Sequence, residues 1–241
     1  MAVNANSFAS IDVQAGFLRE AMWFKCLPDP MQALVLATAY ERSVRAGECI
    51  AHAGERSGQW FGVVHGLLQM SVSGLGGDET TLHCLRENEW GGEGSLLKHE
   101  ARRYNVVAVV PSRVCLVPAD TFYTLHREVV SFNHFLLDNL NERMAVAVGL
   151  LADARLCSPE RRVAKCLLML VERRAPSTLP IPIQQNDLAL ICGLSRQRTN
   201  RALSSLQRAR LVRVDRYGLR ILDTLSLQRY ANEISEVSEV G

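Results

Sequence analysis

The first half of the chain alternates short apolar runs with turns. Between Val44 and Thr121 each run is four to seven residues long, and turns rich in glycine, proline or aspartate separate them: Trp60–Val64, Leu67–Val72, Thr80–Leu85, Tyr104–Val110 and Val114–Val117. Strands of this length with frequent turns are typical of a sandwich or barrel. Residues from about Phe17 to Tyr40 precede them and are expected to form short helices.

A helical pattern begins at Asp120 and continues to about Leu156. Its apolar residues recur at spacings of three and four and form one stripe, which contains Val129, Phe132, Leu136, Leu140, Met144, Ala147 and Leu151. More apolar residues lie off this stripe, so the helix must be covered on more than one side. One side can pack on the strands and the other on the same helix of a second subunit. A core helix of a monomer is the alternative.

Three shorter helices and a hairpin are expected in the C-terminal part of the chain. Ser158-Pro159-Glu160 marks a boundary, because a serine cap and a proline at the first helical position begin a new helix. The pattern then predicts a helix over Asp187–Cys192, a glycine turn at Gly193 and a second helix from Ser195 to about Ala209. Two apolar runs follow and are expected to form a β-hairpin wing: Leu211–Val214 and Leu219–Leu222.

The second helix of this pair has two distinct faces. Its apolar face follows the spacing i, i+3, i+4, i+7 and contains Thr199, Ala202, Leu203 and Leu206. An α-helix fits the major groove of DNA, where arginine can bond guanine and an amide can bond adenine. A serine cap and the free N–H groups of a helix start suit a phosphate. We therefore expect a winged helix-turn-helix whose DNA-contacting residues are Ser195, Arg196, Gln197, Asn200 and Arg201. An ordinary helical hairpin with a charged solvent face is the alternative.

The distribution of charge agrees with a nucleic-acid partner. The net charge is only +2, but residues 160–220 hold 13 Arg and Lys against 4 Asp and Glu. Such an asymmetry indicates that the C-terminal part meets a polyanion. Four more arginines can add phosphate contacts that raise affinity without reading sequence, namely Arg208, Arg210, Arg213 and Arg216.

Several other classes of protein are disfavoured. The seven cysteines are odd in number and contain no C-x-x-C pair, so we expect buried free thiols and neither a disulfide framework nor a zinc ribbon. No apolar run reaches the roughly 18 residues of a membrane span. The start of the chain lacks a signal-peptide pattern, which favours the cytoplasm. With no nucleophile–base pair, metal-ligand spacing or P-loop, neither an enzyme nor a metal site is expected.

Residues 193–203, GLSRQRTNRAL, resemble the G-[LC]-S-R-x-x-x-x-R-x-L core of the Crp/Fnr family of bacterial regulators. The resemblance implies that Arg196, Gln197 and Arg201 read bases. The family often has Glu where this chain has Gln197, and Gln suits adenine, so the preferred half-site can differ from the family's usual one.

The N-terminal half also resembles this family, whose sensory domain is a β-roll of the cyclic-nucleotide-binding type. The matching turns are Arg45–Ile50, Gly54-Glu55 and Gln59–Gly66, and Trp90–Leu97 resembles the phosphate-binding cassette. The implied fold class is α+β, with an N-terminal double-stranded β-helix (a jelly-roll-like β-roll), a long dimerisation helix and a C-terminal winged helix-turn-helix. The corresponding domains are residues 17–120, 121–157 and 158–230.

In members that bind cyclic nucleotides, the cassette glutamate holds the ribose hydroxyl, and backbone N–H groups and an arginine hold the phosphate. The matching candidate residues here are Gly92, Glu93, Gly94, Ser95, Arg102 and Arg103. An ion pair between Glu93 and Arg102 that only supports the barrel is the alternative. Two departures argue against cyclic AMP: Tyr104 replaces a small residue, and Ala147 and Val148 replace residues that hydrogen-bond the base. No cofactor is therefore assigned, and a cyclic nucleotide stays a candidate effector.

The sequence favours a homodimer that binds a two-fold-related site on double-stranded DNA, with half-sites about one helical turn apart. Family resemblance favours an activator, with RNA polymerase as a second partner. Two alternatives stay open. The β-roll can be purely structural in a constitutive DNA binder, or the chain can sense redox state or haem, with His83 and Cys84 as candidate ligands.

Overall fold

The computed structural model describes residues 16–74, 79–171, 181, 183–215 and 218–232. The chain divides into two compact units, residues 1–148 and 149–241. The helix α6 (Val130–Leu156) begins in the first unit and ends in the second. Among the described residues, no helix is both long enough and apolar enough to cross a membrane.

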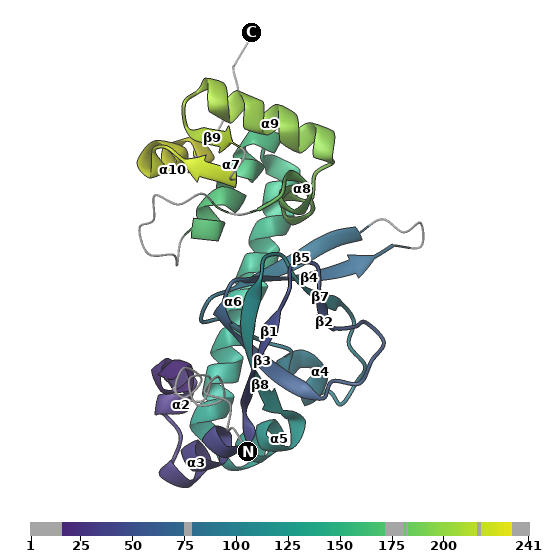
Figure 1. Ribbon diagram of the computed structural model, residues 1–241, viewed down its shortest axis with the longest axis vertical. Coiled ribbons are helices and arrows are strands. Elements are labelled where there is room, and N and C mark those ends of the chain that lie inside the picture. The colour runs from purple at the N-terminus through teal and green to yellow at the C-terminus, as the bar shows by residue number, and fades with distance from the viewer. Residues whose placement is uncertain (1–15, 75–78, 172–180, 182, 216–217, 233–241) are drawn as a thin grey trace, which may run out of the picture. The chain divides into compact units, whose positions relative to one another are not determined.

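The first unit is built on two antiparallel four-stranded sheets (Figure 1). One sheet has the order β1-β8-β3-β6, formed by β1 (Tyr40–Val44), β8 (Ser112–Pro118), β3 (Gln59–His65) and β6 (Trp90–Gly91). The other has the order β2-β7-β4-β5, formed by β2 (Cys49–Ala51), β7 (Asn105–Ala108), β4 (Leu67–Ser73) and β5 (Glu79–Arg86). The strands β1, β2 and β6 were not anticipated from the sequence. β2 and β6 contain three and two residues, which is too short for a periodic signal, and β1 holds three consecutive polar residues among its five.

Side chains alternate between the two faces of each strand, and this alternation builds two cores. Phe61, Val63, Leu68 and Val106 belong to a cluster with members from both sheets, between which it lies. Trp60, one residue before Phe61, belongs instead to a second cluster. The β-roll therefore buries both faces of β3, whose register with β8 runs from the pair Gln59–Pro118 to the pair His65–Arg113.

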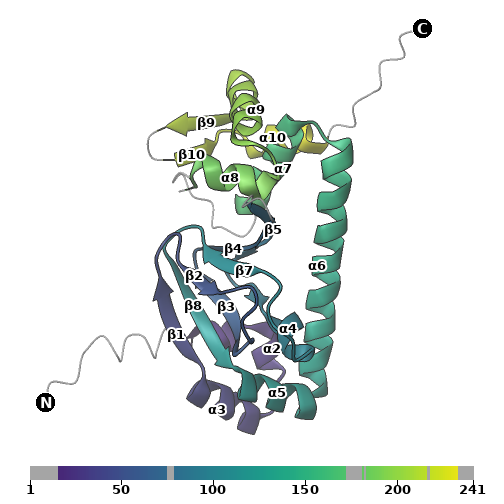
Figure 2. The same ribbon diagram turned by 90° about the vertical axis from the view of Figure 1, so that its right-hand side faces the viewer.

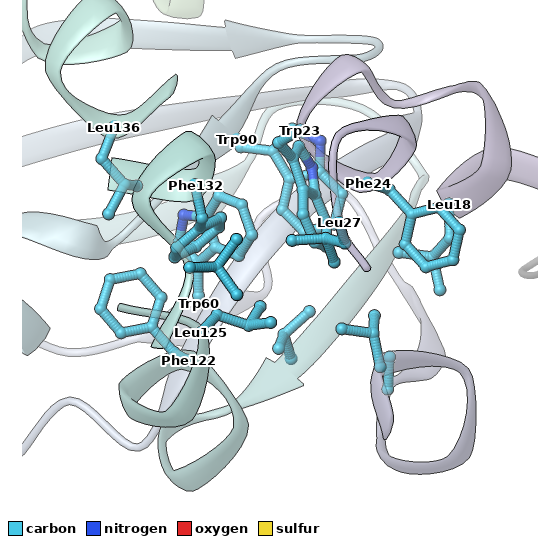
Figure 3. Close-up of a cluster of buried hydrophobic side chains, with 14 of the residues drawn as sticks. Leu18, Trp23, Phe24, Leu27, Trp60, Trp90, Phe122, Leu125, Phe132 and Leu136 are labelled. Carbon is cyan, nitrogen blue, oxygen red and sulfur yellow. The ribbon is translucent and has the colours of Figure 1, made fainter. Parts of the chain in front are cut away.

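The second cluster joins one sheet to helices that surround it (Figure 3). It packs α2 (Met22–Lys25), α3 (Asp29–Thr38), α5 (Ala119–Glu128) and the start of α6 against the outer face of β3. All three tryptophans of the chain meet here: the ring centroid of Trp23 lies 4.9 Å from those of Trp60 and Trp90. Phe122 of α5 and Phe132 of α6 also contact the ring of Trp60, so the cluster connects the strands to the long helix.

One expectation for the helical region was wrong. The sequence predicted one helix from Asp120 to Leu156, but Val129 takes an extended conformation and separates α5 from α6. The sequence gives no sign of this break, because Val129 is buried and fits the apolar stripe, and no glycine or proline lies beside it. Of that stripe, Val129, Phe132 and Leu136 are buried in the roll, whereas Leu140, Met144 and Leu151 are exposed.

The second unit contains four helices and one hairpin among its described residues. The helices are α7 (Pro159–Val171), α8 (Gln185–Cys192), α9 (Arg196–Arg208) and α10 (Thr224–Asn232). β9 (Val212–Asp215) and β10 (Gly218–Ile221) pair in antiparallel register (Figure 2). Ile181 adds an isolated bridge to Leu219. The expected wing tip at Arg216 and Tyr217 lies outside the described residues.

Candidate DNA interface and effector pocket

The turn between α8 and α9 is set by glycine and serine. Gly193 has φ +60°, a conformation that residues with a Cβ atom adopt only at a cost. Leu194 is buried and anchors the turn in the core of the unit. Ser195 caps the next helix, because its Oγ accepts a hydrogen bond from the backbone N–H of Arg198 at 3.3 Å. Local sequence rules therefore fix where α9 begins.

The helix α9 presents opposite faces to the core and to solvent. Thr199, Ala202, Leu203 and Leu206 are buried against the rest of the unit. Arg196, Gln197 and Arg201 are exposed, and Arg198 is exposed beside them. Three guanidinium groups and one amide thus gather at the amino end of one helix, where the helix dipole also favours an anion.

Asn200 is placed less favourably for reading a base than the sequence suggested. Its side chain is half-buried, and its Oδ1 atom finds no hydrogen-bond partner among the described residues. The geometry leaves Asn200 at the edge between the two faces of α9.

A hollow of about 550 Å³ lies beside the start of α9. Its walls come from the start of α8, from Arg196 and Leu203 on α9, and from the wing at Val214, Asp215 and Gly218. Of the four arginines expected to touch phosphates, Arg208, Arg210 and Arg213 are exposed and Arg216 lies outside the described residues. Helix start, hollow and wing thus form one surface that combines cationic and hydrogen-bonding groups.

In the first unit, the cassette glutamate is buried and paired. Gly92 has φ +93°, and Glu93 follows it as the first residue of α4 (Glu93–Leu97). Glu93 is 0% exposed, and its Oε1 accepts an ion-paired hydrogen bond from Arg143 of α6. Arg143 also donates to the backbone carbonyl of Trp90. The long helix therefore reaches into the cassette through one guanidinium group.

Arg143 was missed by the sequence reasoning. The local signal is weak: Arg143 is one of several charged residues of α6 and lies one turn before Ala147. The ion pair between Glu93 and Arg102, which the sequence left as an alternative, does not form: Arg102 donates from Nη2 to the carbonyl of Gln59 at 2.8 Å and lies over the ring of Phe61. The stronger partner of Glu93 comes from residue 143, far along the chain.

Two buried polar atoms in this region remain without partners. Arg102 is only 5% exposed, and its Nη1 finds no hydrogen bond among the described residues. The same is true of Oε2 of Glu93. A Cβ atom on Gly92 would lie 3.0 Å from Nη1 of Arg102, so only glycine leaves this atom clear. Burial lowers the pKa of Arg102, and the nearby Tyr104 and Glu93 partly offset that effect.

The remaining candidate residues surround this region in different ways. Ser95 is buried, Gly94 is half-buried, and Arg103 is exposed and paired with Glu100 at 3.0 Å. Tyr104 packs on the cluster between the sheets, and its pKa is raised mainly by burial and also by Glu93. The phenol therefore takes up space inside the roll, as expected for a large residue at this position.

His83 and Cys84 cannot bind one iron together. Adjacent residues of a strand point to opposite faces, and the two are paired in register with Met70 and Gln69, respectively. In the part of the chain that the structure describes, no three His, Cys, Asp or Glu side chains could hold a metal ion. The expectation that the cysteines are buried holds for Cys84, Cys115, Cys166 and Cys192, but Cys26 is exposed and Cys49 and Cys157 are half-buried.

His83 makes the stability of the roll depend on pH. Desolvation, reinforced by the charge of Arg143, lowers its pKa to about 4. Because the folded pKa lies below the ordinary 6.5, His83 costs no stability above pH 6.5 and destabilises the fold progressively between pH 6.5 and 4, by about 1–3 kcal/mol. We expect His83→Gln to flatten this part of the pH profile in urea unfolding monitored by tryptophan fluorescence. The exposed His52, changed to Gln, is the control, and equal pH profiles for the two variants would refute the role of His83.

Together the fold and the site define a protein that carries a β-roll and a winged helix-turn-helix in one chain. The profile of the cyclic nucleotide-binding domain matches residues 41–128, and that of the Crp-like helix-turn-helix domain matches residues 161–230. The chain belongs to the Crp/Fnr family of DNA-binding transcription regulators, which confirms the family and the fold class expected from the sequence.

Individual relatives are similar over most of the chain. The cAMP-activated global transcriptional regulator Vfr of Pseudomonas aeruginosa is 27% identical over 188 residues, which cover 75% of this chain and 88% of Vfr. The cyclic AMP receptor protein of Thermus thermophilus is 29% identical over 181 residues, which cover 75% of this chain and 83% of that protein. The structure of FixK2 from Bradyrhizobium japonicum shares the fold with a TM-score of 0.70 at 19% identity, over 80% of this chain and 96% of FixK2.

Proposed function

We propose that this protein is a homodimeric transcription activator that binds a two-fold-related DNA site under the control of a signal sensed in the β-roll. Residues 17–120 would sense, 121–157 dimerise and 158–230 bind DNA, with RNA polymerase as the partner at the promoter. The observation that carries the proposal is the exposed group of Arg196, Gln197 and Arg201 at the capped start of α9. Vfr is named as a cAMP-activated regulator, which supports control of this chain by a signal and leaves the activator role to the family resemblance.

Dimerisation is supported by an exposed apolar row on α6. Leu137, Leu140, Met144 and Val148 follow one another at spacings of three and four, and all are exposed. The side chains of Met144 and Val148 are 64% and 58% exposed, which is unfavourable for large apolar groups in water. A second copy of the same helix would cover the row.

The unpartnered atoms of Arg102 and Glu93 support an effector that combines an anion with a hydroxyl group. The free Nη1 of Arg102 can donate to an anion, and the free Oε2 of Glu93 can accept from a hydroxyl. A cyclic nucleotide has both groups. Ala147 and Val148 offer no side-chain hydrogen bond to a base, and Tyr104 takes up space inside the roll. We therefore propose this class of effector without assigning cyclic AMP.

Base reading by Arg196 is tested with duplexes that the wild-type protein selects from a random pool. We expect Arg196→Ala to weaken binding to the selected duplex by about 1–3 kcal/mol and to relax the preference at one base pair. Arg213→Ala on the wing is the control, because it should weaken binding to all duplexes alike and lower the salt slope by about one. An unchanged preference profile in Arg196→Ala would refute the assignment, and no selection by the wild type would refute the function.

A further inference from the structure

One side chain of α7 holds the turn of the helix-turn-helix from outside. Nη2 of Arg162 donates to the backbone carbonyl of Cys192 at 2.6 Å and to that of Gly193 at 3.0 Å. Both carbonyls lie at the carboxyl end of α8, where backbone acceptors lack partners within the helix and the dipole favours a cation. One charged group of Arg162 therefore provides hydrogen bonds to both carbonyls at the end of α8, where the chain enters the turn.

The position of Arg162 is itself well defined. The helix α7 is anchored in the core by Val163, Ala164 and Leu167, which are all 0% exposed. The core therefore fixes the backbone from which Arg162 extends, and the two hydrogen bonds hold its guanidinium group against the turn. Gly193 is fitted to it, because a Cβ atom there would lie 2.9 Å from Nη2 of Arg162.

The turn is followed at once by the residues proposed to read DNA. Leu194 and the cap Ser195 separate Gly193 from Arg196, so a shift of the carbonyls at 192 and 193 moves the start of α9. Positions of base-reading groups must be accurate to well under 1 Å for bidentate bonds. We propose that Arg162 is a positioning residue that orients the turn, and through it α9, for sequence-specific binding. This inference rests on the proposed DNA-binding function.

Arg162→Gln and its neighbour Arg161→Gln form a matched pair, because they remove the same charge from the same helix. Arg161 donates instead to the carbonyl of Ala231 at 3.4 Å, away from the turn. Binding of full-length protein to the selected duplex and to an unrelated duplex is measured over a salt series. In Arg162→Gln we expect the affinity for the selected duplex, divided by that for the unrelated duplex, to fall about tenfold or more while the salt slope stays unchanged. In Arg161→Gln we expect this ratio to equal that of the wild type.

Two results would overturn the proposal. Equal affinity ratios for Arg162→Gln and wild type would show that the turn does not need the guanidinium group. Equal loss on both duplexes with a salt slope lowered by about one would show that Arg162 contacts phosphate directly. If the wild type selects no duplex, the proposed function fails first, so the two failures are distinguishable.

A second pair of variants keeps the test valid if Arg162→Gln does not fold. Gly193→Ala should reduce the affinity ratio, because its methyl group displaces Nη2 of Arg162 and its positive φ is strained. In an Arg162→Lys background the steric part of this loss should shrink, because the shorter head group leaves room for the methyl. Additive effects of the two changes on the affinity ratio would contradict the proposed contact.

Discussion

Val148→Asp is expected to dissociate the proposed dimer and to weaken operator binding together with it. Burial of one valine side chain stabilises the dimer by about 1.5–3 kcal/mol. Because of the two-fold axis, the same contact occurs twice in the interface. The substitution would also bring two carboxylates together in an apolar interface. The expected loss is therefore about 4 kcal/mol, which raises the dimer Kd about a thousandfold. Sedimentation equilibrium over a range of protein concentrations measures it.

Val146→Asp is the matched control for this experiment. Val146 is also an exposed valine of α6, at 46% exposure, but it lies about half a turn around the helix from the row that contains Met144 and Val148. We expect it to leave the dimer intact. If Val148→Asp stays dimeric, the row is not at the interface, and if both variants dissociate equally, the interface is not confined to the row.

The helix-turn-helix could be predicted because its determinants are local. A glycine, a buried leucine, a capping serine and a 3.6-residue period all lie between Gly193 and Leu206, and each acts on its immediate neighbours. Propensity and periodicity therefore agree there. The half-buried position of Asn200 could not be predicted in this way. A helical wheel gives the angle of a residue around the helix, but not how far the rest of the unit covers that helix.

The cassette region could be predicted only in part, because its key contact joins residues far apart in the chain. The cassette turn is local, so Gly92 and Glu93 could be identified from resemblance. The partner of Glu93 comes from α6, fifty residues later, and depends on how the roll packs on that helix. The break at Val129 has the same origin: the buried apolar residue satisfies the helical pattern, and tertiary packing decides its backbone conformation.

Arg143→Leu is expected to lower the free energy of unfolding of the roll by about 3–5 kcal/mol. The reason is that it leaves the carboxylate of Glu93, which is 0% exposed, without its cationic partner. All three tryptophans lie in the roll's helix-facing cluster, so urea unfolding followed by tryptophan fluorescence reports on this unit. Arg155→Leu, an exposed arginine of the same helix, is the control and should change stability by no more than about 0.5 kcal/mol.

Glu93→Gln in the Arg143→Leu background separates charge from packing. A neutral amide needs no cation, so the double variant should recover most of the lost stability, with a coupling free energy of about 2 kcal/mol or more. Failure to recover would mean that Arg143 acts through its bond to the Trp90 carbonyl or through its stem. The pair also bears on sensing. An effector that uses the Glu93 carboxylate must share it with Arg143, so its binding would act directly on the helix proposed to hold the dimer together.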